Sequence, residues 1–407
     1  MKGLICSNLV KLSHTRGGGG KTSNLKRFTA LSCTLLTTLL TSASAARDIN
    51  AGDHNAFAVN GETVTIKSGA TVQVGNPKIN NYVGSNSSIA VGQNGKESSI
   101  TIEKGGKLNG RIYTRAAKIK DIIINGSIGA GPSNASIINF RGTTIEKIEV
   151  GQTGVLEGGI INSWFNGQGT TSGNSTINNI DIKGKVEGGI KNQSGKMETI
   201  TITGSVSGGI QNDDTMNTLK IENGGSVSGD IINNKTMQNI SVDNGTVNGN
   251  IVNSGTNANT GNISITGTSN VGGSIINQNG ANFNNQITLD QNSKLGGISN
   301  AANSTMSGQL DLKGEVGTIT NAGTLSSQLN LSNKVGEINN AEGGTISNDI
   351  TIQANGSVGA INNAGTMQNI TNNGTLSNIT NSGTMQAITN NGTGTLTLTN
   401  SGGTIDK

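Results

Sequence analysis

The sequence predicts an all-β protein built as a parallel β-helix, a solenoid of roughly 20-residue coils. The first reason is a repeat that runs from residue 186 to residue 363, in which an aliphatic residue opens each copy. Successive openings lie 19 to 24 residues apart, a period typical of solenoid proteins. The openings are Val186, Val206, Val227, Val247, Val271, Leu295, Val316, Val335 and Val358.

The second reason is the alternation of apolar and polar residues within each copy, as in Ile200-Thr-Ile202. This pattern is typical of strands and not of helices. Short strands bury too little surface to be stable alone, so the copies are expected to stack on one another.

The third reason is an asparagine near the end of nearly every copy. In stacked coils these amides would form a hydrogen-bonded ladder. The expected ladder residues are Asn192, Asn212, Asn233, Asn253, Asn277, Asn300, Asn321, Asn340 and Asn363.

Two other folds compete with this prediction. A leucine-rich repeat has a similar period, but it needs a helical half that this sequence lacks. Disorder is the other alternative, because the chain has 62 glycines and only 2% aromatic residues. The fixed register of Ile and Val favours a solenoid, which needs only a thin apolar stripe per coil.

Residues 1–45 are expected to form an extended signal peptide. An apolar run of 13 residues, 28–40, is too short for a permanent membrane anchor. Ala43 and Ala45 form a small-x-small cleavage site, with cleavage predicted after Ala45.

Removal of the predicted leader changes the net charge and the cysteine content of the chain. It holds both cysteines, so the exported chain would contain no disulfide. It also holds six basic residues and no acidic ones, which leaves 22 basic against 24 acidic residues. The net charge of the remaining chain therefore gives no support to nucleic-acid binding.

Three segments are expected after the leader. Residues 46–105 would start or cap the β-helix, and residues 106–360 would hold its repeats. An insertion near 163–175 carries Trp164 and Phe165, a candidate binding loop, although these rings could instead cover the coil. Residues 361–407 repeat every nine residues, so that two units would make one coil of an apparently truncated end.

The residues of known catalytic and metal sites are scarce. His54 is the only histidine outside the leader, in a stretch expected to be a solvated loop. No Cys/His cluster suggests zinc, and the acidic pair Asp213-Asp214 is expected to mark a turn. The sequence therefore predicts no catalytic residue, no metal and no cofactor, and a protein that is not an enzyme.

The long leader, the cysteine-free repeats, the GG-I-x-N corners and units such as ITNSGTM resemble passenger domains of bacterial autotransporters (type V secretion). The likeness spans residues 46–407 and extends to large adhesin-like and vacuolating-toxin-like members. It implies export across the outer membrane, display or release, and host contact. Such passengers leave through a β-barrel translocator, which nothing after Ile388 supplies, and the Asn-Pro-Asn-Leu motif of the two-partner class is also lacking.

The leading functional prediction is a non-enzymatic surface or secreted protein that acts as an adhesin. The alternative is a toxin-like passenger that acts on host membranes, and a polysaccharide-active enzyme is the least favoured. The expected partners are an outer-membrane translocator barrel and a host-cell or matrix receptor, with no nucleic acid. The chain is expected to cross the inner membrane and to remain periplasmic unless a translocator is supplied.

Overall fold

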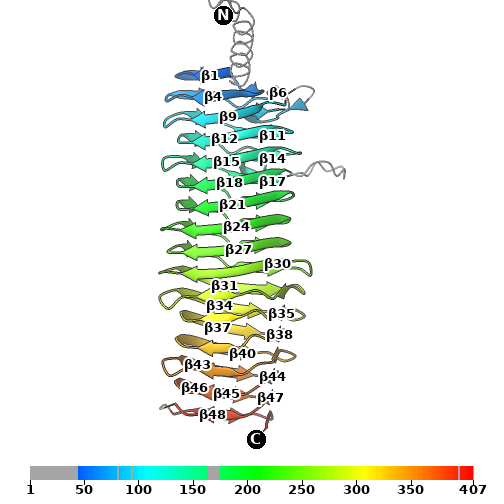
Figure 1. The fold of residues 1–407 in the computed structure, drawn as a ribbon, viewed down its shortest axis with the longest axis vertical. Coiled ribbons are helices and arrows are strands. Elements are labelled where there is room, and N and C mark those ends of the chain that lie inside the picture. The colour runs from blue at the N-terminus through cyan, green and yellow to red at the C-terminus, as the bar shows by residue number, and fades with distance from the viewer. Residues whose placement is uncertain (1–44, 80–81, 93–94, 164–174, 393–394, 407) are drawn as a thin grey trace, which may run out of the picture. The chain divides into compact units, whose positions relative to one another are not determined.

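The repeats stack into one continuous series of coils in the computed structural model. The structure describes residues 45–79, 82–92, 95–163, 175–392 and 395–406. The chain divides into two units, residues 1–45 and 46–407. The second unit is a parallel β-solenoid of about 16 turns, each of about 21 residues (Figure 1). The predicted fold class is therefore confirmed.

Three parallel sheets run along the solenoid. The first sheet has 16 strands: β1 (Ala45–Ile49), β4 (Glu62–Ile66), β9 (Glu97–Ile102), β12 (Lys118–Ile124), β15 (Thr144–Val150), β18 (Thr176–Ile182), β21 (Lys196–Ile202), β24 (Thr215–Glu222), β27 (Thr236–Asp243), β30 (Asn259–Thr266), β33 (Ile287–Leu289), β36 (Leu310–Leu312), β39 (Leu329–Leu331), β42 (Ile350–Ile352), β45 (Ile370–Asn372) and β48 (Ile388–Asn390).

The second sheet has 25 strands, two per coil near the N-terminus and one per coil from β31 onward. They are β2 (Gly52–His54), β3 (Phe57–Val59), β5 (Ala70–Val72), β8 (Ser87–Val91), β10 (Lys107–Leu108), β11 (Arg111–Arg115), β13 (Ser127–Ile128), β14 (Ala135–Phe140), β16 (Val155–Leu156), β17 (Gly159–Ser163), β19 (Lys185–Val186), β20 (Ile190–Asn192), β22 (Ser205–Val206), β23 (Ile210–Asn212), β25 (Ser226–Val227), β26 (Ile231–Asn233), β28 (Thr246–Val247), β29 (Ile251–Ser254), β31 (Asn270–Gln278), β34 (Lys294–Asn300), β37 (Glu315–Asn321), β40 (Lys334–Asn340), β43 (Ser357–Asn363), β46 (Thr375–Asn381) and β49 (Thr397–Asn400).

The third sheet occurs only in the C-terminal coils and has seven strands. They are β32 (Asn282–Phe283), β35 (Thr305–Met306), β38 (Thr324–Leu325), β41 (Thr345–Ile346), β44 (Thr366–Met367), β47 (Thr384–Met385) and β50 (Thr404–Ile405). Outside these sheets, β6 (Lys78–Ile79) and β7 (Tyr82–Val83) form an antiparallel pair, and Pro132–Asn134 form a 3₁₀ turn.

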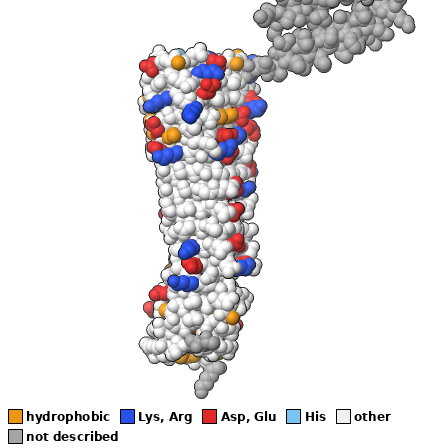
Figure 2. Space-filling model, turned by 90° about the vertical axis from the view of Figure 1, so that its left-hand side faces the viewer, with side chains coloured by type: hydrophobic (Ala, Val, Ile, Leu, Met, Phe, Trp, Pro, Cys, Tyr) orange, Lys and Arg blue, Asp and Glu red, His pale blue; other side chains and the backbone are white. Residues whose placement is uncertain are grey.

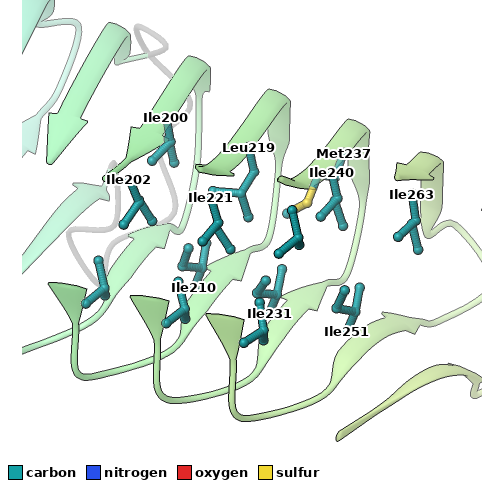
Figure 3. Close-up of a cluster of buried hydrophobic side chains, with 14 of the residues drawn as sticks. Ile200, Ile202, Ile210, Leu219, Ile221, Ile231, Met237, Ile240, Ile251 and Ile263 are labelled. Atoms are coloured by element: carbon teal, nitrogen blue, oxygen red, sulfur yellow. The ribbon is translucent and has the colours of Figure 1, made fainter. Parts of the chain in front are cut away.

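The core consists of aliphatic columns, because the inward residues of each strand meet their equivalents in the next coil. Ile202 pairs in register with Ile182 on one side and Ile221 on the other, and all three are fully buried. Figure 3 shows Ile202 and Ile221 among the stacked side chains of neighbouring coils. Thr201, between two inward residues, is partly exposed on the outer face.

Several strands are longer than the sequence suggested. The alternating pattern marks only three residues of a copy, as in Ile200-Thr-Ile202, whereas β21 has seven residues and β31 has nine. Met197 and Ile200 in β21 are three residues apart, yet both are buried within one strand. The triplet Ile200-Thr-Ile202 is thus only the end of a longer strand, and the buried Met197 was the missed signal.

Each coil contains a corner, where the chain turns between two consecutive short strands. Its position depends on the spacing of the buried residues in the sequence. Val186 and Ile190 are four residues apart and lie in separate strands, β19 and β20. In the C-terminal coils, Val316 and Ile319 are three apart and share β37. There, Met306 and Leu310 are four apart, and the chain turns between β35 and β36.

The corner therefore lies between two strands of the second sheet in the N-terminal coils, and between the third and first sheets in the C-terminal coils. The change takes place between β30 and β33, where the third sheet begins. Among the repeats from residue 186 to residue 363, the coils at the changeover are the longest, with 24 residues from Val247 to Val271 and again to Leu295. In the last coils the repeats of nine residues stack two per coil, so that Ile361 pairs with Ile379 and Ile370 with Ile388.

Candidate functional surface

A ladder of asparagines runs along the inside of the second sheet, and all its members are buried except the last, Asn400. The Nδ2 of Asn192 donates to Oδ1 of Asn212 at 2.8 Å, and Asn212 donates in turn to Asn233 at 2.8 Å. The ladder residues are Asn139, Asn162, Asn192, Asn212, Asn233, Asn253, Asn277, Asn300, Asn321, Asn340, Asn363, Asn381 and Asn400.

Each ladder amide also bonds to backbone, which accounts for its burial. Asn192 Nδ2 donates to the carbonyl oxygen of Thr215 at 2.8 Å, and Asn212 Nδ2 donates to that of Thr236 at 2.7 Å. Since buried amides need partners for both donors, these bonds satisfy the side chain. The ladder is therefore part of the structural framework and is not accessible to a ligand.

The ladder has one altered step, in the coil where the corner moves. Asn233 Nδ2 lies 3.5 Å from Asn253 Oδ1, and the hydroxyl of Thr260 lies 2.9 Å from each amide. Thr260 occupies the column position that Met237 holds in the preceding coil. A polar residue thus replaces an apolar one in the core, and it is satisfied by the ladder itself.

Two sequence-predicted features lie outside the described residues. Trp164 and Phe165, the candidate binding loop, belong to a segment that follows β17 and is not described. Ala43 of the predicted cleavage site is likewise outside, while Ala45 is the first residue of β1.

The candidate titratable residues do not come together in a site. His54 lies at the end of strand β2, not in the expected loop, because its backbone pairs with Val72 of the next coil. Its Nε2 lies 2.7 Å from the carbonyl oxygen of Asn50. Asp213 and Asp214 occupy the bend after β23, where Asp214 accepts a bond from the backbone N–H of Gly195 at 2.8 Å.

Ion pairs link neighbouring coils on the outer surface near the N-terminus. The Nζ atoms of Lys147 and Lys183 approach the Glu149 carboxylate, at 2.8 Å for Lys183. Hydrogen bonds from Lys147 and then Lys183 lower the pKa of Glu149, and Glu149 raises the pKa of Lys183. Figure 2 shows charged side chains gathered mainly over the N-terminal coils on one face.

Two open grooves have glycine floors. One of about 460 Å³ lies over the corners formed by Gly188, Gly189, Gly208 and Gly209. Another of about 360 Å³ lies over Gly272, Gly296, Gly317 and Gly336. Gly189 is required for close packing, since a Cβ there would lie 2.5 Å from the carbonyl oxygen of Gly209.

A third surface feature, two columns of outward polar residues, lies on the third sheet. It was not identified from the sequence. On this sheet the outward residues form two columns, one at the first position of each strand and one two residues later. They are uncharged as far as Gln386, and the last strand, β50, adds Thr404 and the charged Asp406. The first column is Asn282, Thr305, Thr324, Thr345, Thr366 and Thr384, and the second is Asn284, Ser307, Ser326, Ser347, Gln368 and Gln386. The repeated triplets TMS, TLS, TIS and TMQ were the available signal.

Within the described residues, no group of three or more His, Cys, Asp or Glu side chains is placed to hold a metal ion. In the same part of the chain, no helix is both long and apolar enough to cross a membrane. A comparison with protein-family models and with curated proteins finds no match to this chain.

Proposed function

We propose that residues 46–407 form the passenger domain of a type V secreted protein, which acts by binding at the surface of a host cell or its matrix. The observation that carries this proposal is the fold, a solenoid with regular outward columns along its whole described length. Solenoids create extended binding surfaces in this way. The export signal predicted in residues 1–45 is consistent with a function outside the cell.

The proposal includes an outer-membrane translocator barrel as a partner. A folded or unfolded polar chain does not cross hydrocarbon unaided, because its backbone groups would lose their hydrogen bonds. The supporting features are the predicted leader and the absence of cysteine after it, so that no disulfide would lock the chain before passage.

Binding of the purified protein to cultured cells and to matrix proteins tests the adhesin proposal. The same preparation is added to dye-filled liposomes and to a panel of polysaccharides. We expect saturable binding, with neither dye leakage nor release of sugar. Leakage without binding would instead favour the toxin-like function, and sugar release would favour an enzyme.

A matched pair of variants makes this test specific. Ile202→Asp disrupts the core, whereas Thr201→Asp adds the same charge on the outer face. Binding that depends on the folded solenoid is expected to be lost in the first variant and kept in the second.

A further inference from the structure

We propose that Asn248 is a site of spontaneous deamidation, at which the side-chain amide is converted to an acid by the chain itself. Asn248 lies in the corner between β28 and β29 and is followed by Gly249. A glycine after an asparagine favours this reaction, because no Cβ blocks the approach of the glycine nitrogen to the side chain. The inference concerns covalent chemistry within the chain and does not depend on the proposed function.

The reaction is an attack of the backbone on the neighbouring side chain. The backbone nitrogen of Gly249 forms a bond to Cγ of Asn248, and the bond from Cγ to Nδ2 breaks. Nδ2 leaves as ammonia, which takes up the proton that the backbone nitrogen loses. Water then opens the resulting succinimide ring. Breaking the new bond to Cγ gives aspartate, and breaking the original bond to the backbone carbonyl carbon gives isoaspartate.

Most Asn-Gly pairs of this chain are protected by a hydrogen bond on the glycine N–H, which must break before the nitrogen can attack. The sequence has twelve such pairs, and the structure describes both residues of ten, since Asn94 and Asn166 lie outside the described residues. In eight of the ten, the glycine N–H donates to an oxygen. The eight protected pairs begin at Asn60, Asn109, Asn125, Asn223, Asn244, Asn279, Asn355 and Asn373.

The pair Asn248-Gly249 lacks this protection. Asn248 is exposed, and within the described part of the chain neither its side-chain amide nor the N–H of Gly249 has a hydrogen-bond partner. In the tenth pair, Asn391-Gly392, the side chain is held instead, because its amide donates to Oδ1 of Asn373 at 3.0 Å. Among the described pairs, both reacting groups are free of hydrogen bonds only at Asn248.

Asn109 is an internal comparison, because it occupies the same corner in a coil nearer the N-terminus. The residues that precede Asn109 and Asn248 belong to one column of paired residues in the second sheet. At Asn109, the side-chain amide donates to Oε1 of Gln73 at 2.8 Å, and the N–H of Gly110 donates to Oγ of Ser88 at 2.8 Å. The two sites therefore share a position in the coil and differ in their hydrogen bonds.

Isoaspartate at position 248 would act on bonds that join three coils. The backbone N–H of Asn250 donates to Oδ1 of Asp230 at 2.7 Å, and Oδ1 of Asn250 accepts a bond from the backbone N–H of Ser274 at 2.9 Å. Isoaspartate adds a methylene to the main chain two residues before Asn250 and displaces that residue from both partners. The modified solenoid is therefore expected to open between residues 230 and 274.

Peptide mass spectrometry of the full chain measures the reaction. The folded protein is incubated at mildly alkaline pH and digested at intervals, and aspartate and isoaspartate formed after time zero are quantified in each Asn-Gly peptide. We expect conversion at Asn248 to be at least about fivefold faster than at Asn109 and the other protected pairs, as the absence of one hydrogen bond implies. Equal rates at Asn248 and Asn109 would overturn the proposal.

The same incubation in concentrated urea separates structure from local sequence. Unfolding removes the hydrogen bonds at both sites, so the rates at Asn248 and Asn109 are expected to become similar. If the difference persists in urea, it comes from the neighbouring residues, and the role assigned to the fold is wrong.

A double variant tests the protection from the other direction. Gln73→Ala with Ser88→Ala removes both hydrogen bonds at Asn109. Conversion at Asn109 is expected to rise about fivefold or more, while the protected pair at Asn223 stays slow and shows that the fold is kept. An unchanged rate at Asn109 would show that these bonds do not separate the two sites, which contradicts the choice of Asn248.

The structural consequence is tested with Asn248→Ser, which copies Ser207 and Ser228 of the two preceding coils and has no side-chain carbonyl carbon to attack. After the same incubation, limited proteolysis is expected to cut the wild type between residues 230 and 274 and to leave this variant intact. If isoaspartate forms in the wild type and both proteins resist protease equally, the predicted opening of the coils is wrong.

Discussion

The amide nitrogen of Asn192 lies 2.8 Å from the amide oxygen of Asn212, which is 20 residues later in the chain and one coil further along the solenoid. This bond repeats from coil to coil and lies beside the aliphatic columns. The register of the coils is therefore fixed by a directional interaction as well as by apolar packing.

Asn212→Leu is expected to lower the free energy of unfolding by about 1–3 kcal/mol, because it removes the buried acceptor used by Asn192 and the buried donor to Asn233. Leucine has a similar volume, so little of the loss comes from a cavity. Urea unfolding measures the change. Asn234→Leu, at an exposed position one residue after the ladder, serves as control and should change stability little.

Ile202→Asp is expected to open the neighbouring coils to protease, since an unpaired carboxylate in the core is costly. Thr201→Asp should leave the digestion pattern unchanged, because its side chain faces outward. Limited proteolysis followed by mass spectrometry compares the two. Equal sensitivity would show that the assigned register is wrong.

Gly317→Ala is expected to destabilise the C-terminal coils by more than about 1 kcal/mol, because the added Cβ would lie 2.1 Å from the carbonyl oxygen of Gly296. Thr318→Ala, the next residue, changes only an outward side chain and is the control. Thermal unfolding of both variants tests whether glycine is needed there for close coil packing. Similar melting temperatures would argue against it.

The sequence was sufficient for the fold class and for the inward residues. An apolar residue such as Ile202 recurs once per coil, and stacking is the only way to bury all its equivalents. It was not sufficient for the corners. Val316 and Ile319 are three residues apart and share a strand, whereas Met306 and Leu310 are four apart and the chain turns between them. A difference of one residue is too small to notice within a repeat of varying length.

The surface was harder to predict than the core. Thr305 and Thr324 attract no notice in a chain rich in threonine, and only the third sheet aligns them into a column. The chemistry of Trp164 and Phe165 rested on residue type alone, and they lie outside the described residues. Recurrent burial leaves a strong sequence signal, whereas outward residues are aligned only by the three-dimensional register.

The acid sensitivity of the solenoid is expected to depend in part on Glu149. Its pKa is lowered in the folded chain by Lys147 and Lys183, so the folded state binds fewer protons than the unfolded one. The stability from these pairs is present above about pH 4.3, the usual pKa of Glu, and is lost as the pH falls through the lowered value. The contribution is less than about 1 kcal/mol, as for other surface pairs.

Urea unfolding of the wild type and of Glu149→Gln between pH 3 and pH 7 measures this effect. The wild type should be the more stable near pH 7, and the difference should shrink below about pH 4. A difference that grows toward low pH would contradict the sign of the shift.

The central claim, parallel coils stacked in register, is tested most directly by a distance between spin labels at Thr201 and Thr351. The two lie on one outward column that passes through Lys220, Ser241, Ser264, Thr288, Asp311 and Asn330. Seven steps of about 4.8 Å predict a single narrow distance near 34 Å. A broad distribution, or a narrow one displaced by a coil or more, would contradict the stacking described here.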